Sequence, residues 1–96
     1  MDIVIYTSVE TLVHKKGLNE PYSHFFWSLS RRPKNFEAGD KVFFAVKGEV
    51  KGYFISDDIG TGTEHRTEIT WAKDTWKDLE KPIPTKPFRG FRYRWW

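Results

Sequence analysis

The sequence contains no cysteine and no long apolar run. The absence of cysteine excludes disulfide bonds, thiolate metal sites and a cysteine nucleophile. No apolar stretch approaches the length of a membrane-spanning helix. The N-terminus, MDIVIYTS, has an acid at position 2 and lacks the basic-then-apolar order of a signal peptide. We therefore expect a cytoplasmic protein with no membrane partner.

The common motifs of catalysis and metal binding are also absent. His14, His24 and His65 do not have the spacing of metal ligands. There is no phosphate-binding loop, nucleophile elbow or dinucleotide fingerprint, since GTGT at residues 60–63 has no lysine after it. We expect neither a metal site nor a cofactor.

Acidic residues are missing from one particular segment, the last twelve residues. Residues 85–96 hold Lys86, Arg89, Arg92 and Arg94, whereas the rest of the chain has one more acidic than basic side chain. A second basic cluster, Arg31, Arg32 and Lys34, lies in SRRPK. Segregated basic clusters favour an anionic partner such as nucleic acid. The alternative is a solvated surface that carries no site.

What is present fits one small domain. A chain of 96 residues is too short for two hydrophobic cores, so we predict a single domain over residues 1–96. Aromatic residues make up 18% of the chain, and a few large rings can fill a small core.

The beginning of the chain predicts a strand that leads directly into a helix. Residues 3–7, IVIYT, are short, β-branched and apolar, as in a buried strand. Thr7 and Glu10 have the spacing of a capping box. Positive charge at residues 14–16 and Gly17 after it are typical of a helix end. We therefore predict a helix over residues 8–16.

The middle of the chain predicts β-structure. Residues 24–31 are rich in aromatic side chains and predict a strand. KVFFAV and EVKGYFISDD predict a hairpin around Lys47 and Gly48. Residues 58–65 predict a polar loop. Residues 66–72 alternate, with Thr67, Ile69 and Trp71 on one face.

The end of the chain predicts a short helical turn and a last strand. Asp74 is placed to cap a turn that holds Trp76 and Leu79, and the proline-rich residues 81–87 predict extended chain. In the final strand, one face carries Phe91, Tyr93 and Trp95, and the other carries Arg92, Arg94 and Trp96. We expect the first set in the core. The predicted fold is α+β: a small mixed β-barrel of about six strands with one main helix after the first strand.

One stretch resembles a known family. FEAGDKVFFAVKGEVKGYFI, residues 36–55, resembles the PUA-like superfamily, in particular its ASCH and EVE branches. The resemblance implies a barrel that binds RNA or a modified base in a cleft beside the first helix. In EVE-type domains, a tryptophan, a small residue and basic residues border this pocket. The matching positions here are Trp27, Ser28 and the basic run Arg31, Arg32 and Lys34.

The same resemblance raises an enzymatic alternative. Some ASCH domains are amidohydrolases that deacylate a modified cytidine, with a lysine shortly after a glycine at the helix exit. Here Gly17 is followed by Asn19, whereas Lys16 precedes the glycine. This departure speaks against the activity, although Lys16, Glu20 and Arg31 could still converge in space.

The sequence therefore leaves three functions open. The first is a non-catalytic module that binds RNA or a modified base. Its nucleic-acid contacts would be Trp27, Ser28, Arg31, Arg32, Lys34, Arg89, Arg92 and Arg94, and its pocket residues Thr7, Ser8 and Lys16. Arginine binds phosphate and stacks on bases, and aromatic rings stack on bases.

The second function is the amidohydrolase. The third is a protein-interaction domain, such as a homodimer, with its contact at Trp95 and Trp96. The structural alternatives are a core position for Trp27 and an ordinary helix cap for Thr7 and Ser8.

Overall fold

The computed structural model of the chain describes residues 1–15, 24–62, 66–72 and 75–96. These residues form seven strands and one helix in the order β1 (Ile3–Tyr6), α1 (Val9–Lys15), β2 (His24–Leu29), β3 (Lys41–Val46), β4 (Glu49–Thr61), β5 (Thr67–Ala72), β6 (Lys77–Pro84) and β7 (Phe91–Tyr93). The domain is mostly β, and its single described helix follows the first strand as predicted.

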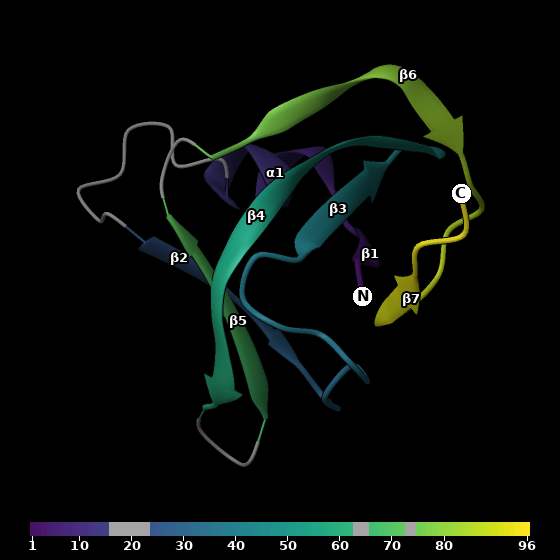
Figure 1. Cartoon of the computed structure of the whole chain (residues 1–96). Helices are drawn as coiled ribbons and strands as arrows, with labels where there is room; N and C mark the ends of the chain where they lie inside the picture. Colours follow the sequence, from purple (N-terminus) through teal and green to yellow (C-terminus); the bar gives the residue numbers. More distant parts are fainter. Residues whose placement is uncertain (16–23, 63–65, 73–74) are drawn as a thin grey trace.

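The strands form one curled sheet that closes halfway into a barrel (Figure 1). The order across the sheet is β2-β5-β4-β3-β1-β7, and β6 pairs with β4 beside this path. Strands β1 and β3 are parallel, and the other pairs are antiparallel. The long strand β4 runs through both halves of the sheet, because its first part pairs with β3 and β6 and its part from Ser56 onward pairs with β5, with a register shift between Ser56 and Asp58. Such irregularities bend a strand and increase its twist.

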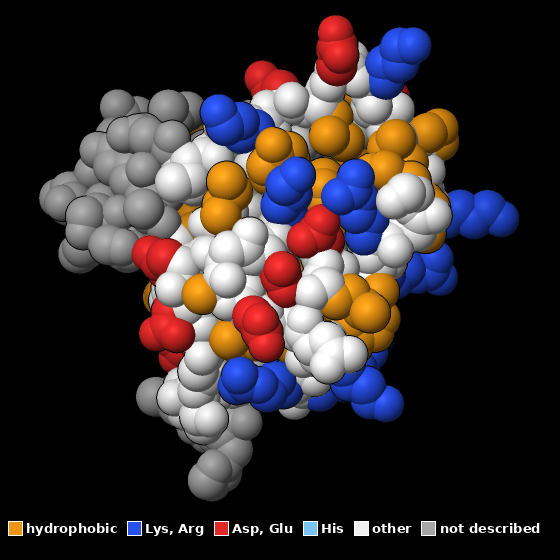
Figure 2. Space-filling view, in the orientation of Figure 1, with side chains coloured by type: hydrophobic (Ala, Val, Ile, Leu, Met, Phe, Trp, Pro, Cys, Tyr) orange, Lys and Arg blue, Asp and Glu red, His pale blue; other side chains and the backbone are white. Residues whose placement is uncertain are grey.

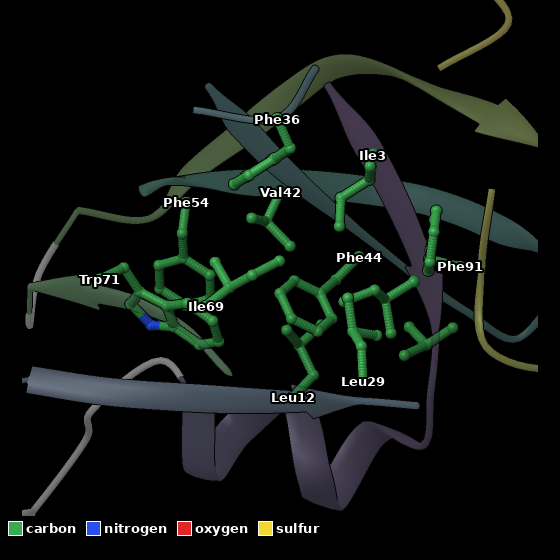
Figure 3. Close-up of a cluster of buried hydrophobic side chains, with 12 residues drawn as sticks. Ile3, Leu12, Leu29, Phe36, Val42, Phe44, Phe54, Ile69, Trp71 and Phe91 are labelled. Atoms are coloured by element: carbon green, nitrogen blue, oxygen red, sulfur yellow. The ribbon is translucent and has the colours of Figure 1, made fainter. Parts of the chain in front are cut away.

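The inner face of the curl holds the main core, shown in Figure 3. Its buried side chains are Ile3, Ile5, Leu12, Leu29, Phe36, Val42, Phe44, Val46, Phe54, Ile69, Trp71 and Phe91. Helix α1 contributes Leu12 to this cluster and covers one side of it. The predicted alternation of β5 is confirmed, since Thr67, Ile69 and Trp71 are all buried.

A second, smaller cluster lies on the outer face of β1, β3 and β4. It consists of Val4, Phe43, Ala45 and Val50, and Leu79 and Ile83 of β6 pack against it. Both faces of β1 and β3 are therefore buried. This explains why these strands are continuous apolar runs rather than alternating ones.

Three local predictions are wrong. Trp76 is not in a helical turn: the chain is extended there, and Lys77 already begins β6, while Asp74 lies outside the described residues. The polar loop predicted over residues 58–65 begins later, because β4 continues to Thr61. Trp95 is not in the core, since β7 ends at Tyr93 and the Trp95 side chain is 44% exposed.

Candidate nucleic-acid interface

The two outermost strands of the sheet approach each other at the residues where the two basic clusters begin. Strands β2 and β7 are the outermost strands of the sheet order. The curl brings Leu29, the last residue of β2, and Phe91, the first residue of β7, into the same core cluster, as Figure 3 shows. The basic loop that follows β2 therefore lies next to the basic segment that precedes β7.

A hollow of about 260 Å³ lies at this junction. Its lining residues are Leu29, Ser30, Arg31, Arg89, Gly90 and Phe91. Arg31 belongs to the first basic cluster and Arg89 to the second. The fold thus unites two clusters that are far apart in the sequence. Neither Arg32, Lys34, Arg92 nor Arg94 lines the hollow.

Arg31 is held in place by an aromatic ring. Its guanidinium carbon lies 4.2 Å from the centre of the Phe91 ring, within the range of a cation–π interaction. Phe91 is only 6% exposed and belongs to the core, so the ring is a fixed support. This contact limits the positions that the long Arg31 side chain can adopt. Its N–H groups can still donate hydrogen bonds.

The loop that carries Arg31 is anchored at two points. The backbone N–H of Lys34 donates a hydrogen bond of 2.8 Å to the hydroxyl of Tyr93 on β7. Farther along, Asp40 accepts hydrogen bonds from the backbone N–H of Glu37 at 2.9 Å and from the N-terminal ammonium of Met1 at 2.5 Å. Burial would raise the pKa of Asp40, but these hydrogen bonds and the ammonium charge outweigh it and lower the pKa below its ordinary value.

The part of the chain that the structure describes places no ion-pairing acid beside the cations of the hollow. Among the described residues, no carboxylate forms an ion pair with Arg31, Arg32, Arg89 or Arg92. Arg94 differs, because its guanidinium donates to the Asp2 carboxylate at 2.9 Å. Figure 2 shows Lys and Arg side chains on the side of the molecule where β7 lies in Figure 1. Most of the visible Asp and Glu side chains lie toward the centre and left.

Arg92 and Arg94 lie on the outer face of the sheet, opposite the core side chains Phe91 and Tyr93. The guanidinium carbon of Arg92 is 5.1 Å from the Phe88 ring centre. That of Arg94 is 5.0 Å from the Phe43 ring and 5.2 Å from the Trp96 ring. The predicted division of the last strand into a core face and an arginine face is therefore confirmed for residues 91–94. The arginine face is distinct from the hollow.

The remaining β2 residues have mainly structural contacts. Trp27 is half-buried and packs edge-on against Phe44, with ring centres 5.2 Å apart. The Ser28 hydroxyl accepts a hydrogen bond of 2.7 Å from Arg66 Nε. Arg66 therefore lies beside the end of β2 that leads to the hollow. The sequence pattern does not identify this residue. Its position follows only from the pairing of β2 with β5.

Two of the residues predicted for a pocket at the start of α1 have structural roles instead. Ser8 caps the helix, and Thr7 extends the sheet. Ser8, not Thr7, is the N-cap, because the backbone N–H of Thr11 donates to the Ser8 hydroxyl at 3.2 Å. The Thr7 N–H donates to the Ala45 carbonyl at 2.9 Å and continues the β1–β3 pairing. Lys16 and Glu20, the residues on which the amidohydrolase alternative depends, lie outside the described residues.

A separate cleft does lie beside α1, with a volume of about 400 Å³. Its lining residues are Val9, Leu12, Val13, Val46, Lys47, Lys51, Asp78, Leu79 and Pro82. None of the predicted nucleic-acid contacts lines it. The cleft beside α1 and the hollow lined by Arg31 and Arg89 are thus in different places.

The chain matches no protein-family model, no curated protein and no solved structure. Within the described part of the chain, the one helix is too short to cross a membrane. Function must therefore be argued from the geometry of the chain itself.

Proposed function

We propose that this domain binds single-stranded nucleic acid, with the hollow between β2 and β7 as the centre of its contact surface. The observation that carries this proposal is the convergence of Arg31 and Arg89 on one hollow. No described carboxylate neutralises either of them. Two arginines with unsatisfied charge at a concave site are suited to phosphate oxygens, which they bind through several N–H groups each.

Other exposed side chains of the basic loop and of the end of the chain supply further contacts for a nucleic-acid strand. Arg32 and Lys34 are exposed on the loop that follows Arg31, and Arg92 is exposed on the outer face of β7, so all three can neutralise further phosphates. Trp95 and Trp96 are 44% and 36% exposed, and flat rings of this kind stack on bases without regard to sequence. Both side chains are more exposed to solvent than Trp27, which packs against the core.

The PUA-like resemblance belongs to the same proposal. It rests on the stretch FEAGDKVFFAVKGEVKGYFI, and the curled sheet with one helix after the first strand is an architecture that such a domain requires. Under this proposal the domain binds RNA or a modified base in the cytoplasm. Its main phosphate contacts lie at the β2–β7 junction rather than in the cleft beside α1.

A salt series of anisotropy titrations with short single-stranded RNA and DNA tests the proposal. We expect the logarithm of the affinity to fall linearly with the logarithm of the salt concentration. The double variant Arg31→Gln/Arg89→Gln should lower this slope by about 1.4, since each lost phosphate contact on a single strand contributes about 0.7. The matched control is Lys77→Gln/Lys81→Gln, which removes two exposed cations from β6.

The proposal would be wrong if affinity did not depend on salt. It would also be wrong if the control pair weakened binding as much as the arginine pair. In the second case the interaction would be a general attraction to a positively charged protein. Thermal unfolding of both double variants verifies that each is folded.

A second candidate is a protein-interaction surface, such as a homodimer contact, at the end of the chain. The specific observation is that Trp95 and Trp96 are exposed next to each other, with ring centres 4.9 Å apart. Tryptophan and arginine are frequent anchors of protein interfaces. Sedimentation of the wild type and of Trp95→Ala/Trp96→Ala at high concentration decides this: a wild-type monomer removes the candidate.

A further inference from the structure

The two arginines of the hollow carry more positive charge than an internal phosphodiester needs. A phosphodiester has one negative charge, whereas a terminal phosphate carries about −1.5 to −2 at neutral pH. We infer that the hollow binds a phosphate monoester, namely the terminal phosphate of a nucleic-acid strand. This inference rests on the proposed function and specifies which part of the ligand enters the hollow.

The charge argument depends on the lining residues alone. Arg31 and Arg89 contribute two positive charges, and the other lining residues, Leu29, Ser30, Gly90 and Phe91, contribute none. Two guanidinium groups repel each other when no anion lies between them. A dianion removes this repulsion and can accept hydrogen bonds from both groups on its three terminal oxygens.

The shape of the hollow also suits the end of a strand. Its floor is made of the buried side chains Leu29 and Phe91, so a ligand cannot pass through toward the core. Three positions after Arg31 in the sequence, the hydrogen bond from Lys34 N–H to the Tyr93 hydroxyl joins the loop to β7. A terminal group needs an approach from one side only.

The backbone at Gly90 is open to the ligand. Gly90 has a φ of 70°, a left-handed conformation that favours glycine, and it lies between Arg89 and the supporting ring of Phe91. Without a side chain, it leaves room for phosphate oxygens to approach the main chain. Arg31 is already held over Phe91, so little conformational freedom remains to be lost there on binding.

The test compares one short oligouridylate RNA in three forms: with a 5′-phosphate, with a 3′-phosphate and with neither. In the phosphorylated forms, the fluorescent label is at the end opposite the phosphate. Anisotropy titrations at about pH 7.5 should show about tenfold tighter binding of a phosphorylated form. The two phosphorylated forms identify which end enters. Inorganic phosphate and uridine 5′-monophosphate as competitors separate recognition of the phosphate alone from recognition of the nucleotide.

Two further arms test whether the monoester dianion is what the hollow recognises. The preference should shrink at about pH 5, where the phosphate has taken up a proton, because its second pKa is about 6. The described lining residues include no acid and no histidine, so the change reports on the phosphate. Arg89→Gln should abolish the preference, and Lys86→Gln, which removes a cation of the same segment outside the hollow, should retain it.

The outcomes separate the inference from the proposed function. Salt-dependent binding with equal affinity for all three RNA forms would overturn the inference and leave the proposed function standing. A preference that Arg89→Gln retains would also overturn it. If none of the three forms bound at low salt, the proposed function and the inference would both be wrong.

Discussion

The hydroxyl of Tyr93 accepts a hydrogen bond of 2.8 Å from the backbone N–H of Lys34, across 59 positions of the sequence. The Tyr93 ring packs against the core and lies edge-on to Phe91, with ring centres 5.5 Å apart. One side chain therefore joins the basic loop, the last strand and the core. This hydrogen bond ties the loop that carries Arg31 to the strand that follows Arg89.

Replacing Tyr93 by phenylalanine should loosen the loop without disturbing the core. We expect Tyr93→Phe to lower the free energy of unfolding by about 0.5–1.5 kcal/mol, the usual net contribution of a hydrogen bond. Amide hydrogen exchange at Lys34 should become faster, and affinity for single-stranded RNA should fall a few-fold. Tyr53→Phe is the control, because Tyr53 packs against Phe43 on the other face of the sheet. Unchanged exchange at Lys34 would contradict this role.

Phe91 has two functions that different substitutions separate. Phe91→Ala should cost about 3–5 kcal/mol of stability, as is usual for truncating a buried aromatic ring. Phe91→Leu keeps most of the packing but removes the ring under the Arg31 guanidinium. We expect Phe91→Leu to weaken RNA binding about two- to fivefold through the lost cation–π interaction. Phe54→Leu removes another buried ring away from Arg31 and should leave RNA affinity unchanged.

Local patterns predicted most of the strands correctly. The apolar runs of β1 and β3, the glycine-containing turn at Lys47 and Gly48, and the alternation of β5 each depend on neighbouring residues. The helix after β1 was predicted too, but its cap was not. Ser8 takes that position because the backbone of Thr7 still continues the β1–β3 pairing, through its N–H to the Ala45 carbonyl, and the helix begins only at Val9. Only the tertiary pairing of β1 with β3 decides between the two residues.

The site could be predicted only in part. The sequence identified both basic clusters, but nothing local reveals that Arg31 and Arg89 line one hollow. That convergence follows from the order of the strands and from the curl that brings their two outermost members together. Trp95 was assigned to the core by extending the alternation of β7 beyond Tyr93, where the strand ends. The segment after Trp76, for which local patterns predict a helical turn that holds Leu79, instead pairs with β4 as β6, a long-range contact that no local pattern shows.

Gly52 allows β6 and Trp76 to approach β4 closely. A Cβ atom at this position would overlap the Lys77 carbonyl oxygen and the Trp76 ring, which is also held by a hydrogen bond of 2.7 Å to Asp78. We expect Gly52→Ala to lower the free energy of unfolding by about 1–3 kcal/mol, as overpacking usually does. In Gly60→Ala the new Cβ meets no atom within 4 Å, so this control on the same strand should be tolerated. Denaturant titration measures the free energy of unfolding of both variants. Equal stability of the two variants would refute the close approach of β6 and Trp76 to β4.

We expect the free energy of unfolding of the domain to depend on pH through the carboxylate of Asp40. Its carboxylate is 27% exposed and accepts hydrogen bonds from the Met1 ammonium and the Glu37 N–H, which hold its pKa in the folded state below the ordinary value. The unfolded chain then takes up a proton at higher pH than the folded one. The contribution of Asp40 is therefore complete above the unfolded pKa of about 3.9 and is lost as the pH falls through the folded pKa.

Asp40→Asn removes this dependence, because asparagine does not titrate. At neutral pH we expect the variant to unfold at a lower temperature than the wild type, since it loses the ion pair with the Met1 ammonium. The difference between the two melting temperatures should narrow as the pH falls below about 4. Glu80→Gln, which removes a carboxylate from the exposed side of β6, is the control and should show no such convergence. A melting-temperature difference for Asp40→Asn that stays constant from neutral pH into acid would show that the carboxylate does not stabilise the loop through its charge.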